Sequence, residues 1–249
     1  MDQSKTFFAK VYGDYALFSS PSSKSSGDKA SYQVPTKEAL RGIVDQIYFK
    51  PTFKNVIEEV KVLNEIKTEA MGARTLMMGG SNDLNSYTYL KDVSYLVKFH
   101  FEWNLDREDL AHDRNIKKHE AIMERSLKKG GRRDVFLGTR ECYAFVEKID
   151  KEKYENTKSF YDAQSLSFGI MFSEFIYPTE PGGELVSCFT ETSMVDGKIT
   201  FKDSKDCEIK NTLDTYSFKY PYEIKSVDKE YEEYENFEEG GYECTRSSS

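Results

Sequence analysis

The stretch Val93–Trp103, "VSYLVKFHFEW", is the clearest strand in the 249-residue chain, and the fold prediction starts from it. Every second residue is aromatic or a branched aliphatic: Val93, Tyr95, Val97, Phe99, Phe101 and Trp103. The residues between them are polar apart from Leu96, and His100 falls on this second, polar face. An alternation with a period of two is typical of a β-strand with one buried face.

Two strands and a helix are predicted on the N-terminal side of this stretch. Phe7–Phe18 is apolar and β-prone, and Val56–Ile66 carries β-branched residues, so both are predicted strands. Between them, Thr36 can cap a helix that has one apolar face at helical spacing: Leu40, Ile43, Val44 and Ile47. This helix is predicted to end at Tyr48, because Pro51 forbids its continuation.

A second helix and a further strand are predicted on the C-terminal side. One helical face is formed by Ile116, His119, Ile122, Met123, Ser126 and Leu127. Gly130 stands where a helix stop is expected, and Val135–Val146 is predicted to be a strand. Three polar, charged or Gly-rich segments are predicted loops: Ser19–Ser31, Met71–Asn85 and Asp106–Asp113.

The predicted order is β-α-β followed by β-α-β. It favours an α+β protein whose N-terminal domain, residues 1–153, is ferredoxin-like, the architecture of RNA-recognition (RRM-like) modules. Residues 154–227 are predicted to form a smaller antiparallel β-sheet subdomain, since "LSFGIMFSEFIYP" is strand-like and Asp196-Gly197 is a two-residue hairpin turn. Residues 228–249 are an acidic tail that we expect to be disordered.

The composition bounds the class of protein. The formal net charge is -8 and 38% of residues are hydrophobic, and no apolar run approaches the ~20 residues that span a bilayer. The N-terminus has no apolar core of a signal peptide. The four cysteines form no C-x-x-C pair, and no histidine lies at a ligand spacing from them, so neither a zinc knuckle nor a disulfide framework is predicted. We expect a cytoplasmic protein with reduced thiols and no membrane partner.

Positive charge is concentrated in one stretch of this acidic chain. Arg114–Arg133 holds eight basic and two acidic residues, whereas Asp228–Ser249 holds two basic and eight acidic residues. Phosphate binding depends on such a local patch and not on the net charge. Within the patch, "KKGGRR" is either a solvated helix end followed by a turn, or a contact to phosphate or RNA that the glycines permit.

Several enzyme classes find no support in the sequence. The chain has no G-x-x-x-x-G-K-[ST] loop and no G-x-S-x-G nucleophile motif. "HEAIM" lacks the second histidine of the zinc-protease helix H-E-x-x-H, because Met123 stands there. The acidic residues of the loop Asp106–Asp113 have neither D-x-D nor EF-hand spacing, so no metal and no cofactor is predicted.

Two interpretations of His119 remain open. A lone histidine on a helix face is most often structural. Its place in the first turn of a helix, beside Lys117 and Lys118, also suits a general acid or base at a phosphate. Cleaving RNA without a metal requires the substrate's own 2′-OH, a base, an acid and a cation that stabilises the phosphoryl oxygens, and His, Lys and Tyr can fill these roles.

Four blocks of the sequence resemble one known family. They are "GDYALF", "SYQVPTKEALRGIVDQIYFKPTF", "YTYLKDVSYLVKFHFEWN" and "KKHEAIMERSLKKGGRRDVFLGTREC". In this order they are similar to the Cas-five proteins of CRISPR subtype I-C, also called the Dvulg subtype, and the resemblance spans Phe7 to Lys225. It implies a ferredoxin-like (RAMP) domain followed by a smaller β-sheet domain. It also implies an endoribonuclease that cleaves precursor CRISPR RNA at the base of the repeat hairpin without a metal.

The resemblance implies particular residues. The tyrosine of the family's "IY-x-KPT" block falls on Tyr48, and its Lys-His pair falls on Lys118 and His119, so these three are the expected catalytic residues. Lys117 duplicates the lysine, and Lys118 is chosen because it directly precedes His119. The expected RNA-binding residues are Lys50, Lys117, Arg125, Lys128, Lys129, Gly130, Gly131, Arg132 and Arg133.

The expected partners are the precursor CRISPR RNA hairpin, the mature 5′ handle and the other subunits of the type I-C Cascade complex. Non-specific binding of double-stranded DNA is a further expectation. A non-catalytic scaffold that grips the handle, as Cas-five subunits of other subtypes do, is the alternative to the enzyme. A metal-dependent DNA nuclease is a third hypothesis, and only the loop Asp106–Asp113 speaks for it.

Overall fold

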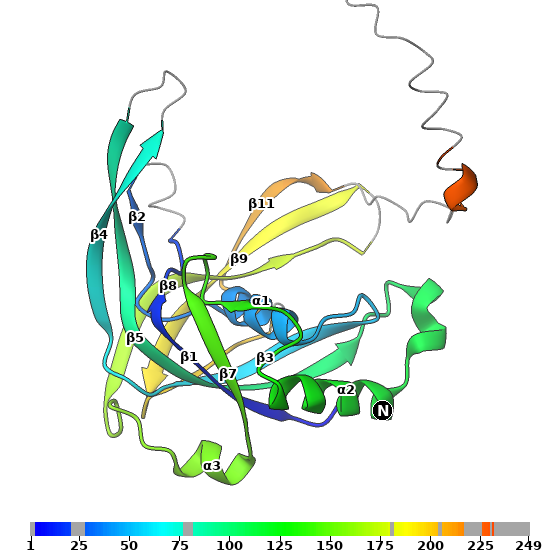
Figure 1. Ribbon diagram of the computed structural model, residues 1–249, viewed down its shortest axis with the longest axis horizontal. Helices are drawn as coiled ribbons and strands as arrows, with labels where there is room; N and C mark the ends of the chain where they lie inside the picture. Colours follow the sequence, from blue (N-terminus) through cyan, green and yellow to red (C-terminus); the bar gives the residue numbers. More distant parts are fainter. Residues whose placement is uncertain are drawn as a thin grey trace, which may run out of the picture.

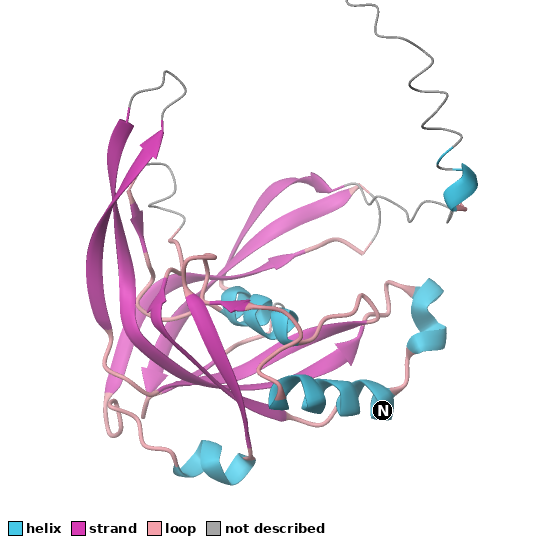
Figure 2. Cartoon of the chain, viewed as in Figure 1, coloured by secondary structure: helices cyan, strands magenta, loops and turns pink. Residues whose placement is uncertain are grey.

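The computed structural model describes residues 3–20, 28–76, 82–179, 182–203, 206–216, 226–229 and 231. Strands predominate in these residues, and the helices are few (Figure 1, Figure 2). The strands are β1 (Phe7–Ala16), β2 (Lys29–Ala30), β3 (Phe53–Val62), β4 (Lys67–Leu76), β5 (Asn82–Trp103), β6 (Val135–Phe136), β7 (Tyr143–Ile149), β8 (Ser165–Ile176), β9 (Gly183–Val195), β10 (Lys198–Thr200) and β11 (Ile209–Tyr216). The helices are α1 (Lys37–Ile47), α2 (Ile116–Lys128), α3 (Lys151–Asn156) and the 3₁₀ segment η2 (Glu108–Asp113).

The centre of the molecule is a mainly antiparallel sheet in which neighbouring strands follow the order β11-β9-β10-β3-β5-β1-β7-β6. β5 lies between β3 and β1, where Val97 is paired with Val60 on one side and with Ala9 on the other. The side chains of Val97, Phe99 and Phe101 are at most 1% exposed. The prediction for Val93–Trp103 is therefore confirmed.

The two predicted helices are present. The Thr36 side chain caps α1 by accepting a hydrogen bond from the Ala39 N–H at 3.1 Å, and Tyr48 is the C-terminal cap. The predicted apolar face of α1 is buried: Leu40, Ile43, Val44 and Ile47. α2 buries the predicted face at His119, Met123, Ser126 and Leu127. Among the described residues, no helix is long and apolar enough to cross a membrane.

The prediction of a loop over Met71–Asn85 is wrong for 71–76 and 82–85, which are strands, and its middle, 77–81, lies outside the described residues. β4 and the first half of β5 form a long antiparallel hairpin that extends beyond the central sheet (Figure 1). Leu84 on this hairpin is 70% exposed, and the strands lack the apolar alternation by which the sequence reveals a strand. In the predicted loop Ser19–Ser31, the short strand β2 pairs with β5 and Ser19 bridges to Ser31, whereas 21–27 lies outside the described residues.

The single strand predicted over Val135–Val146 is two strands. A turn separates β6 from β7, and in it the Cys142 N–H donates to the Thr139 carbonyl at 3.0 Å. Gly138 has a φ of +96° and packs against the Leu17 carbonyl, which would lie 2.0 Å from an added Cβ. A side chain at this position is excluded, so the glycine lets the chain turn against β1.

The short helix α3 has no counterpart in the prediction. It packs Tyr154 against Leu96 and Ile149, on the sheet face that the predicted alternation assigned to polar residues. The Tyr154 hydroxyl donates to Glu59 at 2.6 Å. Within Val93–Trp103, Leu96 is the one apolar residue on that face. It is apolar because it packs in this second, small core.

The C-terminal strands continue the sheet. The predicted hairpin turn at Asp196-Gly197 is confirmed: both residues have positive φ, 52° and 75°, as a type I′ turn requires. Beyond the turn, β10 pairs with β3 and links β9 and β11 to the central strands. The division of the chain after residue 153 stays a prediction. Apart from 228, 229 and 231, the predicted tail 228–249 lies outside the described residues.

The prediction that all thiols are reduced is wrong. Cys188 and Cys207 form a disulfide, with their Cα atoms 5.9 Å apart. The spacing of 19 residues gave no signal, whereas the pairing of β11 with β9 aligns Lys210 with Cys188 and so brings Cys207 near. Cys142 is a free, buried thiol.

Candidate active site

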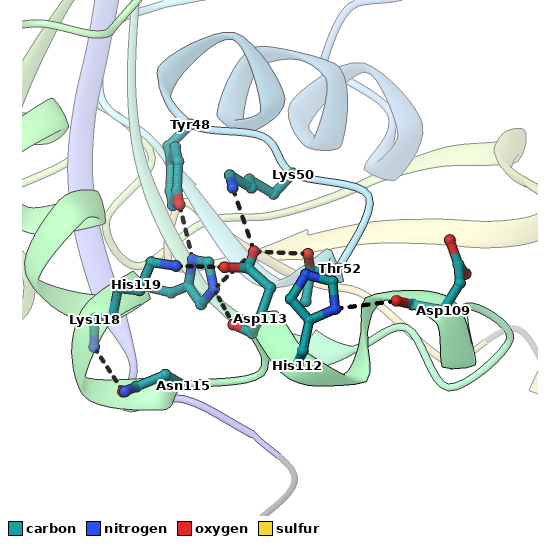
Figure 3. Close-up of polar contacts among 9 residues, drawn as sticks. All are labelled: Tyr48, Lys50, Thr52, Asp109, His112, Asp113, Asn115, Lys118 and His119. Atoms are coloured by element: carbon teal, nitrogen blue, oxygen red, sulfur yellow. Dashed lines mark hydrogen bonds and ion pairs between the residues drawn. The ribbon is translucent and has the colours of Figure 1, made fainter. Parts of the chain in front are cut away.

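Two of the three predicted catalytic residues are in direct contact. Tyr48 follows the last turn of α1, and His119 lies in the first turn of α2. The Tyr48 hydroxyl is 2.8 Å from His119 Nδ1 (Figure 3). The exposed fractions of the two residues are 1% and 0%. The structure thus brings together residues 71 positions apart, and buries both.

The hydrogen bonds define the tautomer of His119. Its Nε2 lies 2.8 Å from the backbone carbonyl oxygen of Asp113. A carbonyl oxygen can only accept, so Nε2 carries the proton and donates it to this bond. Nδ1 is then the acceptor for the Tyr48 O–H. Both nitrogens of the imidazole are then paired, and its N–H points toward Asp113.

Aromatic rings form the wall behind His119. The ring of Phe53 lies 5.4 Å from the imidazole, that of Trp103 5.8 Å and that of Phe101 6.4 Å, measured between centroids. Two of these residues end the alternating stretch of β5, and Phe53 opens β3 beside them. The buried face of the sheet thereby fixes the orientation of the imidazole.

Lys118, the third predicted catalytic residue, faces Asp113. The carboxylate of Asp113 accepts from the ammonium groups of Lys118 and of Lys50, the latter at 3.3 Å, and from the Thr52 hydroxyl at 3.0 Å (Figure 3). The hydrogen bond from Lys118, followed by those from Thr52 and Lys50, lowers the pKa of Asp113 well below its usual range despite some burial. Asp113 is therefore an ionised carboxylate between two cations.

The Gly130-Gly131 pair ends α2 and leads the chain toward Tyr48. The Gly131 N–H bonds to the Ser126 carbonyl at 2.8 Å and the Gly130 N–H to that of Leu127, which is the Schellman termination of a helix. Both glycines have positive φ. The next residue, Arg132, donates its backbone N–H to Ile47 at the end of α1.

This turn places the Arg132 guanidinium over the Tyr48 ring, 5.4 Å from its centroid. Burial raises the pKa of the Tyr48 hydroxyl, and the charge of Arg132 opposes the rise. Tyr48 is thus a neutral phenol at ordinary pH, and acts here as a hydrogen-bond donor.

The other predicted RNA-binding side chains lie on the surface. Those of Lys117, Arg125, Lys128, Lys129, Arg132 and Arg133 are exposed. No carboxylate among the described residues lies within ion-pair distance of them, so this charge is available to an external anion. Lys50 differs, because it is paired with Asp113. Contact of these residues with RNA stays a prediction.

The acidic loop does not converge on a metal site. Asp106 pairs with Lys54 at 2.8 Å, and Asp109 forms two hydrogen bonds with Arg107. In the described part of the chain, no group of three or more His, Cys, Asp or Glu side chains could hold a metal ion. Each of these carboxylates has a basic partner instead.

Sequence reasoning missed Thr52 and Asp113 as members of the site. Thr52 stands inside the "IY-x-KPT" block, so its neighbourhood to Tyr48 was a usable signal. Asp113 was included in a charged loop that we interpreted as solvated, and nothing in the sequence separates it from Asp106 or Asp109. Only the fold places it against His119.

The class of protein follows from this description: it is a mixed α/β protein with a large, mainly antiparallel sheet, and it holds a buried phenol–imidazole pair beside a carboxylate that two lysines bind. Its family follows from sequence comparison: the Cas5d model described as "CRISPR-associated protein (Cas_Cas5)" matches residues 6–203, and the chain belongs to this family.

Individual relatives agree with this assignment. The CRISPR pre-crRNA endoribonuclease Cas5d of Thermus thermophilus is 32% identical over 184 residues, which are 70% of this chain and 74% of the relative. That of Mannheimia succiniciproducens is 28% identical over 164 residues, 56% of this chain and 71% of the relative. A crystal structure of a CRISPR-associated protein is 51% identical and superposes with a TM-score of 0.75, covering 85% of this chain and 99% of the other.

Proposed function

We propose that this Cas5 protein is an endoribonuclease that cleaves precursor CRISPR RNA at the base of the repeat hairpin. It then retains the 5′ handle as a subunit of a subtype I-C Cascade complex. Its relatives in Thermus and Mannheimia carry the name of this activity. The observation that carries the proposal is the contact of Tyr48 with His119 at 2.8 Å, beside the two lysines that flank Asp113.

The order of the elements supports the fold part of this proposal. β1-α1-β3 and β5-α2-β7 are two β-α-β units, and their strands lie side by side in the order β3-β5-β1-β7. This is the ferredoxin-like order of RNA-recognition modules. Within it, both helices deliver one end to the same place: the C-terminal end of α1 carries Tyr48, and the N-terminal turn of α2 carries His119.

The residues fit a reaction that needs no metal. The 2′-OH loses its proton to water as its oxygen attacks phosphorus, the bond to the 5′-oxygen breaks, and the leaving 5′-oxygen takes a proton. His119 donates that proton from Nε2 while its Nδ1 takes the proton of the Tyr48 hydroxyl, and the phenolate regains a proton from solvent. Lys118 and Lys50 stabilise the negative charge that develops on the phosphoryl oxygens. The products carry a 2′,3′-cyclic phosphate and a 5′-hydroxyl.

The alternative is a scaffold that binds the handle without cleaving it. The observation in its favour is the complete burial of His119 with both ring nitrogens paired, as expected for a structural histidine. Binding to the exposed basic side chains would be unaffected by this burial. Double-stranded DNA could use the same surface, and stays a prediction.

A cleavage assay with repeat hairpin RNA in excess chelator separates the two functions. The enzyme cuts the RNA, and a single 2′-deoxy nucleotide at the scissile position stops cleavage but not binding. Replacing His119 with alanine should lower the single-turnover rate by about 10²–10⁴-fold, because a general acid acts chiefly in the transition state. Hairpin affinity should stay within about threefold, since the imidazole contributes little to ground-state binding.

His112→Ala is the matched control, because His112 is exposed and lies only seven residues away in η2. Its rate should equal that of the unchanged protein. Absence of any cleavage by the unchanged protein favours the scaffold. A folded His119→Ala protein that cuts at the normal rate removes His119 from the mechanism.

A further inference from the structure

Asp113 is held by three residues from two other segments of the site. Lys50 and Thr52 come from the chain that leaves α1, and Lys118 comes from the first turn of α2 (Figure 3). We call these three residues the Lys50–Thr52–Lys118 cradle. They surround a single carboxylate, whose side chain is only 13% exposed. His119 Nε2 lies 3.5 Å from the same carboxylate.

The cradle has the chemistry of a phosphate site. Ammonium groups, a hydroxyl and the N-terminal turn of a helix are recurrent ligands of phosphoryl oxygens. A phosphodiester and a carboxylate each present two oxygens that share one negative charge. The donors that hold Asp113 can therefore hold the phosphodiester of RNA instead, but they cannot hold both.

Asp113 also closes the access to His119. The imidazole has no exposed surface, and its one N–H is taken by the Asp113 backbone carbonyl. A substrate oxygen reaches this N–H only after Asp113 has moved away. The cradle and the imidazole are thus covered by the same residue.

The segment that carries Asp113 is held by polar contacts and has no core of its own. η2 contains no buried residue. Beyond Asp113, the Arg114 guanidinium holds the segment by hydrogen bonds to the carbonyls of Asn104 and Arg107, at 3.1 and 3.0 Å. Segments with few buried contacts open at a small fraction of the free energy of global unfolding. Loss of the Asp113 contacts is offset when a phosphodiester takes over the same donors.

We propose that the Lys50–Thr52–Lys118 cradle is the binding site of the scissile phosphodiester, and that Asp113 occupies it in the free protein until RNA displaces it. This inference rests on the proposed function for the identity of the ligand. It assigns Thr52 as a phosphate ligand and Asp113 as an intramolecular competitor. Displacement also frees the His119 N–H, so binding of the phosphate and exposure of the acid are one event.

Binding of a non-cleavable RNA tests the proposal. The probe is the repeat hairpin with one 2′-deoxy nucleotide at the scissile position. Asp113→Asn should bind it about tenfold more tightly, the gain expected if only about one molecule in ten of the unchanged protein is open. Asp109→Asn is the matched control: it removes a carboxylate of the same segment that pairs with Arg107 outside the cradle. It should change the affinity by less than about twofold, because exposed charges are screened by salt.

A second measurement requires no variant. Trp103 is the only tryptophan, and its ring lies 5.8 Å from that of His119. The deoxy RNA should change its fluorescence as Asp113 leaves, and free Asp113→Asn should emit like the RNA-bound unchanged protein. Unchanged emission at saturating RNA would overturn the proposal.

The proposal would also be overturned if Asp113→Asn bound the deoxy RNA no more tightly than Asp109→Asn does. Asp113 would then be a residue that positions His119. The affinity ratio is measured without cleavage, so it tests the cradle even if the unchanged protein fails to cut RNA that has its 2′-OH. That failure would refute the proposed enzyme and leave the phosphate site standing.

Discussion

His119 shows how one residue can satisfy two interpretations at once. It is buried and fully hydrogen-bonded, as a structural histidine is, and its N–H also points to Asp113, the residue that two lysines bind, where a general acid would meet a phosphate. The two interpretations differ in the state of Asp113, which covers the N–H in the free protein. Burial of the imidazole is therefore compatible with catalysis once that cover is displaced.

Replacing Tyr48 with phenylalanine tests the hydrogen bond that orients the imidazole. The change removes the hydroxyl and leaves His119 Nδ1 buried without a donor. We expect a loss of about 1–3 kcal/mol in the free energy of unfolding, the usual cost of an unsatisfied buried polar group. The single-turnover cleavage rate should fall as well, because the tautomer is no longer held.

Urea unfolding followed by circular dichroism measures the first effect, and RNA cleavage the second. Tyr12→Phe is the control, since its hydroxyl donates to Glu147 at an exposed site. Equal stabilities of Tyr48→Phe and the unchanged protein would mean that this bond contributes nothing to the fold.

At the scale of the element, the backbone conformation of the turn after α2 requires its two glycines, and the sequence shows this only in part. "KKGGRR" permits a helix stop, a phosphate contact or both. The structure assigns the glycines to the helix termination, and the same turn brings Arg132 onto Tyr48. Termination and RNA contact are not exclusive, because the backbone needs glycine while the neighbouring side chains stay exposed.

Alanine at each glycine separates their contributions. Gly130 has a φ of +83° and an added Cβ would meet only the Val146 carbonyl at 3.5 Å, whereas Gly131 has a φ of +118° and a Cβ 3.0 Å from the Arg133 carbonyl. We expect Gly130→Ala to lose about 1 kcal/mol and Gly131→Ala about 2–3 kcal/mol, since the second combines strain with a clash. Thermal unfolding measures both.

The exposed Gly42 in α1 provides the control, because nothing lies within 4 Å of an added Cβ and alanine favours a helix. Its replacement by alanine should stabilise the protein. A Gly131→Ala protein as stable as Gly130→Ala would show that the turn relaxes around the new side chain.

At the scale of the whole molecule, the C-terminal strands are tied to the N-terminal unit. β10 adds to β3, and the buried ammonium of Lys37 in α1 bonds Glu174 of β8 at 2.7 Å and the Lys202 carbonyl at 2.9 Å. The helix that ends in Tyr48 is thereby fixed at its other end to the C-terminal strands. Exposed basic side chains then line the surface near the site, although the chain as a whole is acidic.

The salt dependence of RNA binding tests this surface. Arg132→Ala with Arg133→Ala should weaken binding and flatten the plot of log K against log salt by about 0.7–0.9 for each lost phosphate contact. Lys151→Ala with Lys153→Ala is the control, since these exposed lysines lie on α3, away from the site. An unchanged slope in the arginine variant would mean that these two residues contact no phosphate and belong to a solvated turn.

The sequence by itself determined the elements whose patterns are strong, and the family. The alternation of Val93–Trp103 and the apolar face of α1 are local properties, because the periods of a strand and a helix are set by backbone geometry. The Asp196-Gly197 turn is local as well, because the conformation of a two-residue hairpin turn depends on those two residues. The hairpin of β4 and β5 escaped prediction, because its strands carry no apolar alternation.

Only the tertiary structure decided how the site is assembled. Tyr48 and His119 meet because α1 and α2 pack on one sheet, and no local pattern encodes a contact between residues that far apart. The Cys188–Cys207 disulfide depends in the same way on strand pairing. Asp113 is the sharpest case: in the sequence it is one acid of a charged loop, and in the fold it holds two lysines and a threonine and covers the imidazole. Charge and residue spacing can be read from the sequence, whereas contacts between residues far apart in the chain depend on how the core packs.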